Sequence, residues 1–101
     1  MVVQAGSAIL HTEQLVLAGG QTTIAAVENA APVVRSLTVS LPDAAAAMRY
    51  QQSVLGQATG AYNLATNSCV THCGDVLRAG GLEAPTTTRT IMGWLRGLAG
   101  D

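Results

Sequence analysis

The chemically reactive side chains of this chain gather in one short stretch. Both of its cysteines and one of its two histidines lie between Tyr62 and Gly81, in the segment YNLATNSCVTHCGDVLRAGG. If this stretch is helical, Cys69, His72 and Cys73 are spaced i, i+3 and i+4 and share one face of the helix. The spacing is compatible with a metal site, a redox pair, a buried helix stripe or a catalytic nucleophile.

Two of these interpretations fit the spacing poorly. A zinc site needs a fourth ligand, which would be His11, Asp75 or water, and tetrahedral sites usually draw their ligands from two segments. Redox motifs separate their cysteines by two residues, whereas three residues separate Cys69 from Cys73. We therefore expect no metal and no cofactor, and we keep a metal-binding helix with Cys69, His72 and Cys73 as an alternative.

Cys69 meets the requirements of a nucleophile better. Thr66, Asn67 and Ser68 are all capable N-caps, so Cys69 is expected in the first turn of a helix. In that turn the unpaired backbone N–H groups and the helix dipole stabilise a thiolate, and the same N–H groups can hold an oxyanion. Cys73 lies one turn deeper and is expected to pack in the core.

The elements that would position Cys69 form an α+β domain. The predicted strands come first, over residues 7–17, 22–29 and 33–41. The predicted helices follow, over residues 42–55, 66–81 and 87–98. This order predicts a single domain over residues 1–101, in which helices pack on one face of a small antiparallel sheet of about three strands.

Composition restricts the classes of function. The chain has 101 residues, a formal net charge of −1 and no lysine, and its arginines are scattered, so a basic nucleic-acid surface is not expected. No apolar run approaches the roughly 20 residues that span a bilayer, so no membrane span is expected either. The start of the chain, MVVQAGSAIL, lacks the pattern of a signal peptide. We expect a product of the cytoplasm that can be the C-terminal fragment of a larger protein.

The cysteine segment resembles the nucleophile helix of the circularly permuted papain-like hydrolases. This family includes the NlpC/P60-type and lecithin:retinol acyltransferase-like groups and the effector domains of secreted bacterial toxins. The matching residues are Tyr62-Asn63-Leu64, Asn67, Cys69, His72, Val76-Leu77 and Ala79-Gly80. The chain departs from the family pattern at Ser68, where a second asparagine is usual, and in the short segment before the first predicted strand.

The resemblance implies a catalytic dyad. In the permuted arrangement the catalytic histidine precedes the cysteine on the first strand of the sheet, and His11 stands in that place. Cys69 is then the nucleophile and His11 the base. Tyr62 is a candidate wall of the substrate groove, and Asn67 and Ser68 are further candidates for contact with the substrate.

A third residue should orient the ring of His11. If the hairpin turns at Gly19-Gly20, Glu28 faces His11 across the two strands. With a loop longer by one residue Asn29 takes that place, and Glu13, on the same face as His11, is a third candidate. His72 is a second candidate base that could touch Cys69 at i+3, but it would lack a fixed orienter. The resemblance implies instead that this position packs inward.

The function implied by the resemblance is a cysteine-dependent hydrolase or acyltransferase that acts on an amide or ester bond. Peptides, peptidoglycan stem peptides and lipids are compatible substrates. A toxin effector further implies synthesis in a bacterial cytoplasm, export by a secretion system to a target cell and a cognate immunity protein. The alternative from another class is a non-catalytic binding or structural module with the same fold.

Overall fold

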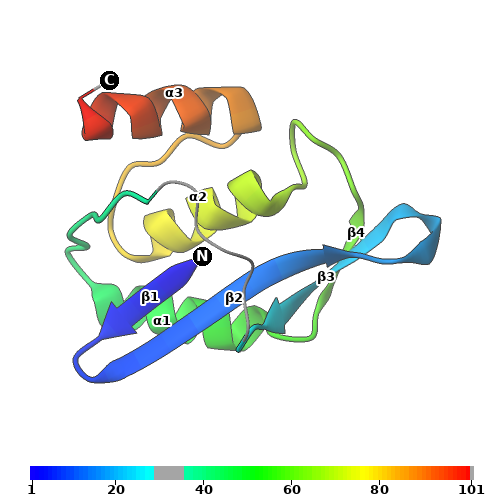
Figure 1. Ribbon diagram of the computed structural model, residues 1–101, viewed down its shortest axis with the longest axis horizontal. Helices are drawn as coiled ribbons and strands as arrows, with labels where there is room; N and C mark the ends of the chain where they lie inside the picture. The colour runs from blue at the N-terminus through cyan, green and yellow to red at the C-terminus, as the bar shows by residue number, and fades with distance from the viewer. Residues whose placement is uncertain (29–35, 101) are drawn as a thin grey trace.

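The structure, a computed structural model, describes residues 1–28 and 36–100 of the chain. Four antiparallel strands form the sheet in the order β1-β2-β3-β4, accompanied by three helices (Figure 1). The strands are β1 (Val2–Ala5), β2 (Ala8–Val16), β3 (Gln21–Ala26) and β4 (Ala58–Ala61). The helices are α1 (Ala44–Val54), α2 (Cys69–Ala79) and α3 (Thr88–Ala99). The predicted α+β class, with an antiparallel sheet and three helices, is confirmed.

The strands differ from the prediction in three places. Strand β1 pairs with β2 through a two-residue turn at Gly6 and Ser7, where Gly6 has a φ of 62° that suits glycine. Strand β4 pairs with β3 and lies outside every predicted strand and helix. The strand predicted over 33–41 is wrong for residues 36–41, which form no strand, and its first three residues lie outside the described part.

Helix α1 begins after Asp43, whose side chain accepts a hydrogen bond from the backbone N–H of Ala46 at 2.9 Å. Its inward face carries Ala47, Met48 and Gln51, all buried. Gln52, the next residue, is exposed.

The helices α1 and α2 pack on one face of the sheet, and α3 packs on α2 (Figure 1). Residues alternate between the two faces of a strand. On β2, Thr12 points to the helices, because its hydroxyl is bonded to both α1 and α2. The main apolar cluster joins Val3, Ala47, Met48 and Val76, which tie β1, α1 and α2 together.

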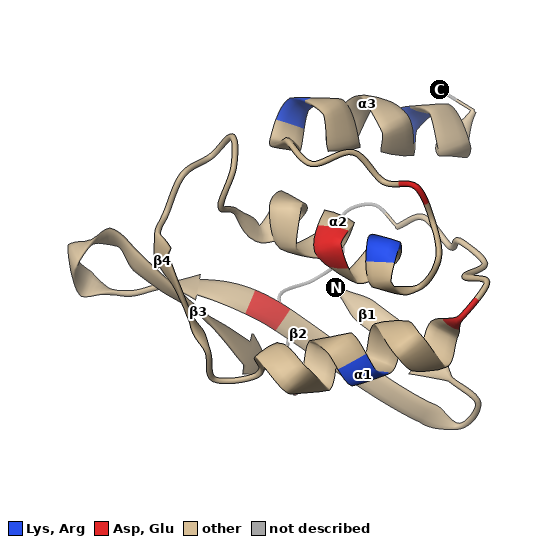
Figure 2. Cartoon of the chain, turned by 180° about the vertical axis from the view of Figure 1, so that it is seen from behind, with Lys and Arg blue, Asp and Glu red and all other residues tan. Residues whose placement is uncertain are grey.

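Charged residues are sparse and spread over several elements (Figure 2). In the described part of the chain they do not gather into the stripe of cations that phosphate binding requires. Among the same residues, the helices are too short or too polar to traverse a bilayer.

Candidate functional site

Cys69 is the first residue of α2, and it is exposed. The preceding residue, Ser68, forms a capping box with Thr71, in which each side chain accepts a hydrogen bond from the other residue's backbone N–H. Within the described residues the backbone N–H groups of Cys69 and Val70 have no acceptor. The predicted placement of the thiol at the open end of a helix is therefore confirmed.

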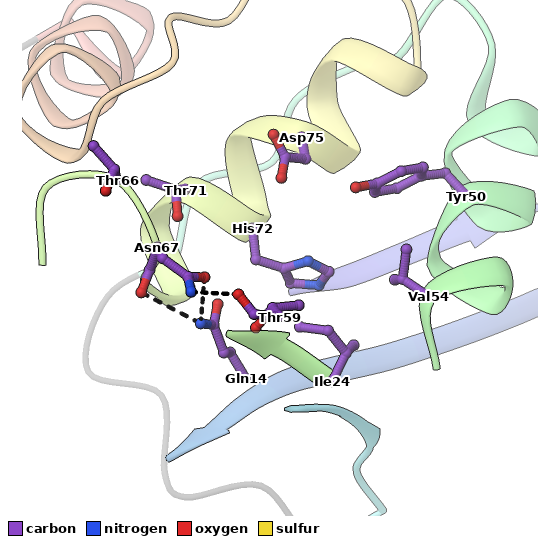
Figure 3. Close-up of a pocket in the computed structure, with 10 residues that line it drawn as sticks. All are labelled: Gln14, Ile24, Tyr50, Val54, Thr59, Thr66, Asn67, Thr71, His72 and Asp75. Atoms are coloured by element: carbon purple, nitrogen blue, oxygen red, sulfur yellow. Dashed lines mark hydrogen bonds between the residues drawn. The ribbon is translucent and has the colours of Figure 1, made fainter. Parts of the chain in front are cut away.

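The loop before α2 is fixed by Asn67. Its side-chain amide donates to the carbonyls of Thr59 at 2.6 Å and Ala61 at 2.8 Å, and its Oδ1 accepts from Gln14 Nε2 at 3.0 Å (Figure 3). These bonds tie the start of α2 to β4 and β2. The Asn67 side chain therefore anchors the loop, and its hydrogen-bonding groups are engaged within the protein.

The other two predicted substrate contacts differ in access. Ser68 is only 1% exposed, and its hydroxyl is bonded to the Thr88 hydroxyl at 3.1 Å. It joins α2 to the start of α3 and presents almost no surface, so its predicted contact with a substrate stays a prediction that its burial does not favour. Tyr62 is 42% exposed and remains open to solvent in the loop before α2.

His11 lies on the face of the sheet away from α2. Its neighbour Thr12 bonds to the helices, so the strand alternation directs the His11 side chain to the opposite face. The sheet itself separates this ring from the face that α2 covers. The expected dyad of Cys69 and His11 is therefore not assembled.

The predicted orienters of His11 depend on the register between β2 and β3. Thr12 pairs with Ala26, and the backbone N–H of Val27 donates to the His11 carbonyl at 2.9 Å. Val27 thus takes the place predicted for Glu28, because the register is shifted by one residue. Asn29 lies outside the described residues. Of the two candidates in the described part of the chain, Glu13 approaches His11, with 3.7 Å between Glu13 Oε1 and His11 Nε2.

His72 lies between α2 and the sheet and is only 6% exposed. Its Nε2 is 3.1 Å from the Thr12 hydroxyl, which accepts a hydrogen bond from Gln51 Nε2 at 2.7 Å. Desolvation by burial lowers the pKa of His72, and the positive N-terminus of Met1 lowers it further, while Asp75 opposes them. These influences favour the neutral imidazole.

A small polar pocket adjoins His72 (Figure 3). It has a volume of about 80 Å³, and its wall includes His72, Asn67, Gln14, Asp75 and Tyr50. The His72 ring points from α2 into the space beside the sheet (Figure 3). The pocket is large enough for a few waters or one small polar group. Cys69 is not part of its wall.

Cys73 is half-buried, and its thiol lies 3.0 Å from the sulfur of Met1. Burial raises the pKa of Cys73, the N-terminal charge lowers it, and the neighbouring Cys69 raises it. The alternative of a metal-binding helix receives no support. In the described residues, no three or more His, Cys, Asp or Glu side chains are arranged to hold a metal ion.

Sequence reasoning missed Thr12 and Gln51 as partners of His72. Both are completely buried and neutral, and neutral polar residues give no motif of their own. The alternation of β2 could have found Thr12, because it follows His11 directly and must face the other way.

Comparisons with known proteins found no matching family model, no matching curated protein and no matching solved structure. The resemblance of the segment from Tyr62 to Gly81 to papain-like hydrolases stays a prediction.

Proposed function

We propose that the chain is a cysteine-dependent hydrolase or acyltransferase with Cys69 as its nucleophile, acting on an amide or ester bond. The observation that carries this proposal is the exposed Cys69 thiol at the start of α2, beside two backbone N–H groups with no acceptor in the described residues. A helix start favours negative charge. The N–H groups of Cys69 and Val70 are suited to hold the oxyanion that forms when the sulfur attacks an acyl carbonyl.

His72 is the base in this proposal. The chain has two histidines, and His11 lies on the other face of the sheet, so a histidine base for Cys69 within this chain is His72. Residues i and i+3 of a helix are neighbours. Their side chains are not hydrogen-bonded here, and such bonds often tighten only in the complex with substrate.

Thr12 is the hydrogen-bond partner that fixes the position of the His72 ring. The role of base requires the tautomer in which Nε2–H donates to the Thr12 hydroxyl, so that Nδ1 is free to accept a proton. The low pKa of His72 that burial produces favours a neutral ring, which is the form able to act as a base.

The chemical steps follow from these roles. The Cys69 proton passes to His72 Nδ1 while sulfur bonds to the acyl carbon, and the carbonyl electron pair moves to oxygen. The tetrahedral intermediate collapses, and the leaving amine or alcohol takes the proton from His72. Water or an acceptor amine or alcohol then attacks the thioester and gives its proton to His72. The second tetrahedral intermediate collapses, the C–S bond breaks and the acyl product leaves, and the sulfur takes the proton back from His72, so that the thiol is restored.

The resemblance of the segment from Tyr62 to Gly81 supports the wider proposal. Peptides, peptidoglycan and lipids are the proposed substrates. The proposed setting is a bacterial effector, made in the cytoplasm, exported to a target cell and neutralised by an immunity protein that covers Cys69.

Labelling with an electrophilic thiol probe tests the proposal. We expect Cys69→Ala to remove most labelling at about neutral pH, whereas Cys73→Ala keeps it, because burial raises the pKa of Cys73 and limits its access. We expect His72→Gln to slow the labelling of Cys69 by roughly tenfold or more. His11→Gln is the matched control and should label like the wild type.

Two results would contradict the proposal. Equal labelling of Cys69→Ala and Cys73→Ala would mean that Cys69 is no more reactive than Cys73. A loss of reactivity in His11→Gln, with His72→Gln unchanged, would assign the base to the opposite face of the sheet.

A non-catalytic binding module is the second candidate function. It is favoured by the Cys69 thiol, which has no hydrogen bond to an imidazole within the described residues. Reactivity of Cys69 towards iodoacetamide that is ordinary for a free thiol near neutral pH, and that does not change in His72→Gln, would support this candidate.

A further inference from the structure

Gln51 is a buried polar residue with an unusual environment. It is 0% exposed, and its Nε2 donates to the Thr12 hydroxyl at 2.7 Å and to the Met1 carbonyl at 3.3 Å. Its Oε1 is buried and has no hydrogen-bond partner in the described part of the chain. Buried amide oxygens without a partner are rare, so this orientation of the side chain needs a reason.

The Met1 carbonyl fixes the orientation of the Gln51 amide. If the amide were flipped, its oxygen would face the Met1 carbonyl oxygen, and two acceptors would meet. The flipped amide would also leave its NH₂ group without those two partners. The Nε2 group therefore remains directed at Thr12.

The direction of this bond determines what the Thr12 hydroxyl does next. A hydroxyl has one proton, and Thr12 already accepts from Gln51. Thr12 is completely buried, so its own proton needs an acceptor, and His72 Nε2 lies 3.1 Å away. If His72 Nε2 instead carried a proton, the Thr12 proton would be left buried and unbonded.

We infer that Gln51, acting through Thr12, is a positioning residue that holds His72 in the tautomer with its proton on Nδ1. In this state the chain of donors runs from Gln51 to Thr12 to His72. The Nδ1–H group has no hydrogen-bond partner in the described residues and belongs to a side chain that lines the pocket.

The consequence for catalysis rests on the proposed function. A base at Nδ1 needs the opposite tautomer, so Gln51 keeps the resting His72 in the form that cannot accept the Cys69 proton. In the tautomer with the proton on Nε2, the Thr12 hydroxyl proton has no acceptor. This tautomer is therefore less populated than the resting one by roughly tenfold or more. Gln51 thus lowers the reactivity of Cys69 in the resting protein.

Imidazole ¹⁵N NMR of the whole chain tests the inference directly, and His11→Gln assigns the two histidine signals. We expect wild-type His72 to be neutral, with the proton on Nδ1, at a pH of about 7.5, above its ordinary pKa. A wild-type spectrum with the proton on Nε2 would overturn the inference without the need for any interior variant.

Gln51→Glu reverses the chain of donors. At this buried position the neutral carboxyl is favoured; it can donate to the Met1 carbonyl and accept from the Thr12 hydroxyl. Thr12 then accepts from His72, and we expect the proton to move to Nε2. The matched control is Gln52→Glu, the same change at the exposed neighbour, which should leave the tautomer unchanged. A folded Gln51→Glu protein with the wild-type tautomer would contradict the inference.

Thr12→Val keeps the test decisive if Gln51→Glu does not fold. It removes the hydroxyl at nearly constant shape, so the preference for Nδ1–H should be lost, whereas Thr12→Ser should retain it. A Thr12→Val protein that keeps only the Nδ1–H tautomer would refute the relay.

Labelling of Cys69 separates this inference from the proposed function. If both hold, Gln51→Glu labels roughly tenfold faster than the wild type and Gln52→Glu does not. If Gln51→Glu changes the tautomer of His72 but not the labelling of Cys69, Gln51 does position His72, and His72 is not the base for Cys69.

Discussion

The imidazole of His72 lies among groups that act on its charge from three elements. The Thr12 hydroxyl approaches from β2, the N-terminus of Met1 lies next to β1, and Asp75 shares helix α2. Desolvation has the largest effect on the His72 pKa and acts in the same direction as the Met1 charge. The position of the ring therefore favours its neutral form.

The lowered pKa of His72 predicts how stability depends on pH. In the unfolded chain a histidine titrates near its ordinary value of about 6.5, and in the folded chain His72 titrates below it. Between these values the unfolded chain binds more protons, so the free energy of unfolding falls as the pH decreases through this window. Below the folded pKa of His72 the loss from this group is complete.

Urea unfolding, followed by circular dichroism between about pH 7.5 and pH 5, measures this effect. We expect His72→Gln to lose less stability over this interval than the wild type, since glutamine does not titrate. An equal loss in both proteins would show that burial does not disfavour the charged ring.

At the residue scale, the sequence predicted one half of the candidate site. Cys69 follows a run of three capping residues, and capping is a local property that a short window reveals. The partner of Cys69 depends on which face of β2 a side chain occupies and on a register shift of one residue. Such a shift exchanges the neighbours of His11, and no local pattern records it.

Helices α2 and α3 approach each other closely at a glycine. Gly74 is buried on α2, and a Cβ atom there would lie 2.7 Å from Ile91 Cδ1 and 3.3 Å from the Pro85 carbonyl. Ile91 is itself completely buried. Arg78 binds the same connection, donating to the carbonyls of Ala84 and Pro85. The close approach of the two helices therefore depends on glycine at position 74.

Two glycine substitutions test this contact. Gly74→Ala places a methyl group against Ile91, and we expect a loss of about 1–3 kcal/mol in the free energy of unfolding. Gly93→Ala on α3 is the matched control: nothing lies within 4 Å of the added Cβ, and we expect a gain of about 0.5–1 kcal/mol because alanine favours helix. Urea denaturation gives both values. Stabilisation by Gly74→Ala would mean that the helices are not in contact there.

At the element scale, the helices were easier to predict than the strands. Asp43 and Ser68 mark the starts of α1 and α2, and both act as caps in the structure. The segment 36–41 is rich in branched residues but forms no strand, and Leu41 packs against the apolar cluster instead. The four residues of β4 gain their conformation from pairing with β3, which is a tertiary effect that composition does not reveal.

At the scale of the whole molecule, the helices and strands differ in how far they pack into the apolar core. Strand β1, helix α1 and helix α2 share the apolar cluster of Val3, Ala47, Met48 and Val76. Helix α3 packs mainly on α2, on the side away from the sheet (Figure 1). Ile91 is its one buried residue, and Leu98 is 47% exposed. The molecule is thus a sheet with two helices in its core and a third helix attached to its outside.

This arrangement predicts an order of local stability that amide hydrogen exchange can measure. The amides of α2 and of the central strands β2 and β3 should exchange slowest, because opening them breaks the shared core. The amides of α3 should exchange faster than those of α2, since α3 can separate from α2 while the sheet and the other helices stay folded. Ile91→Ala should increase exchange in α3 and leave β2 and β3 nearly unchanged. Equal protection of α2 and α3 in the wild type would contradict this order and would place α3 within the cooperative core.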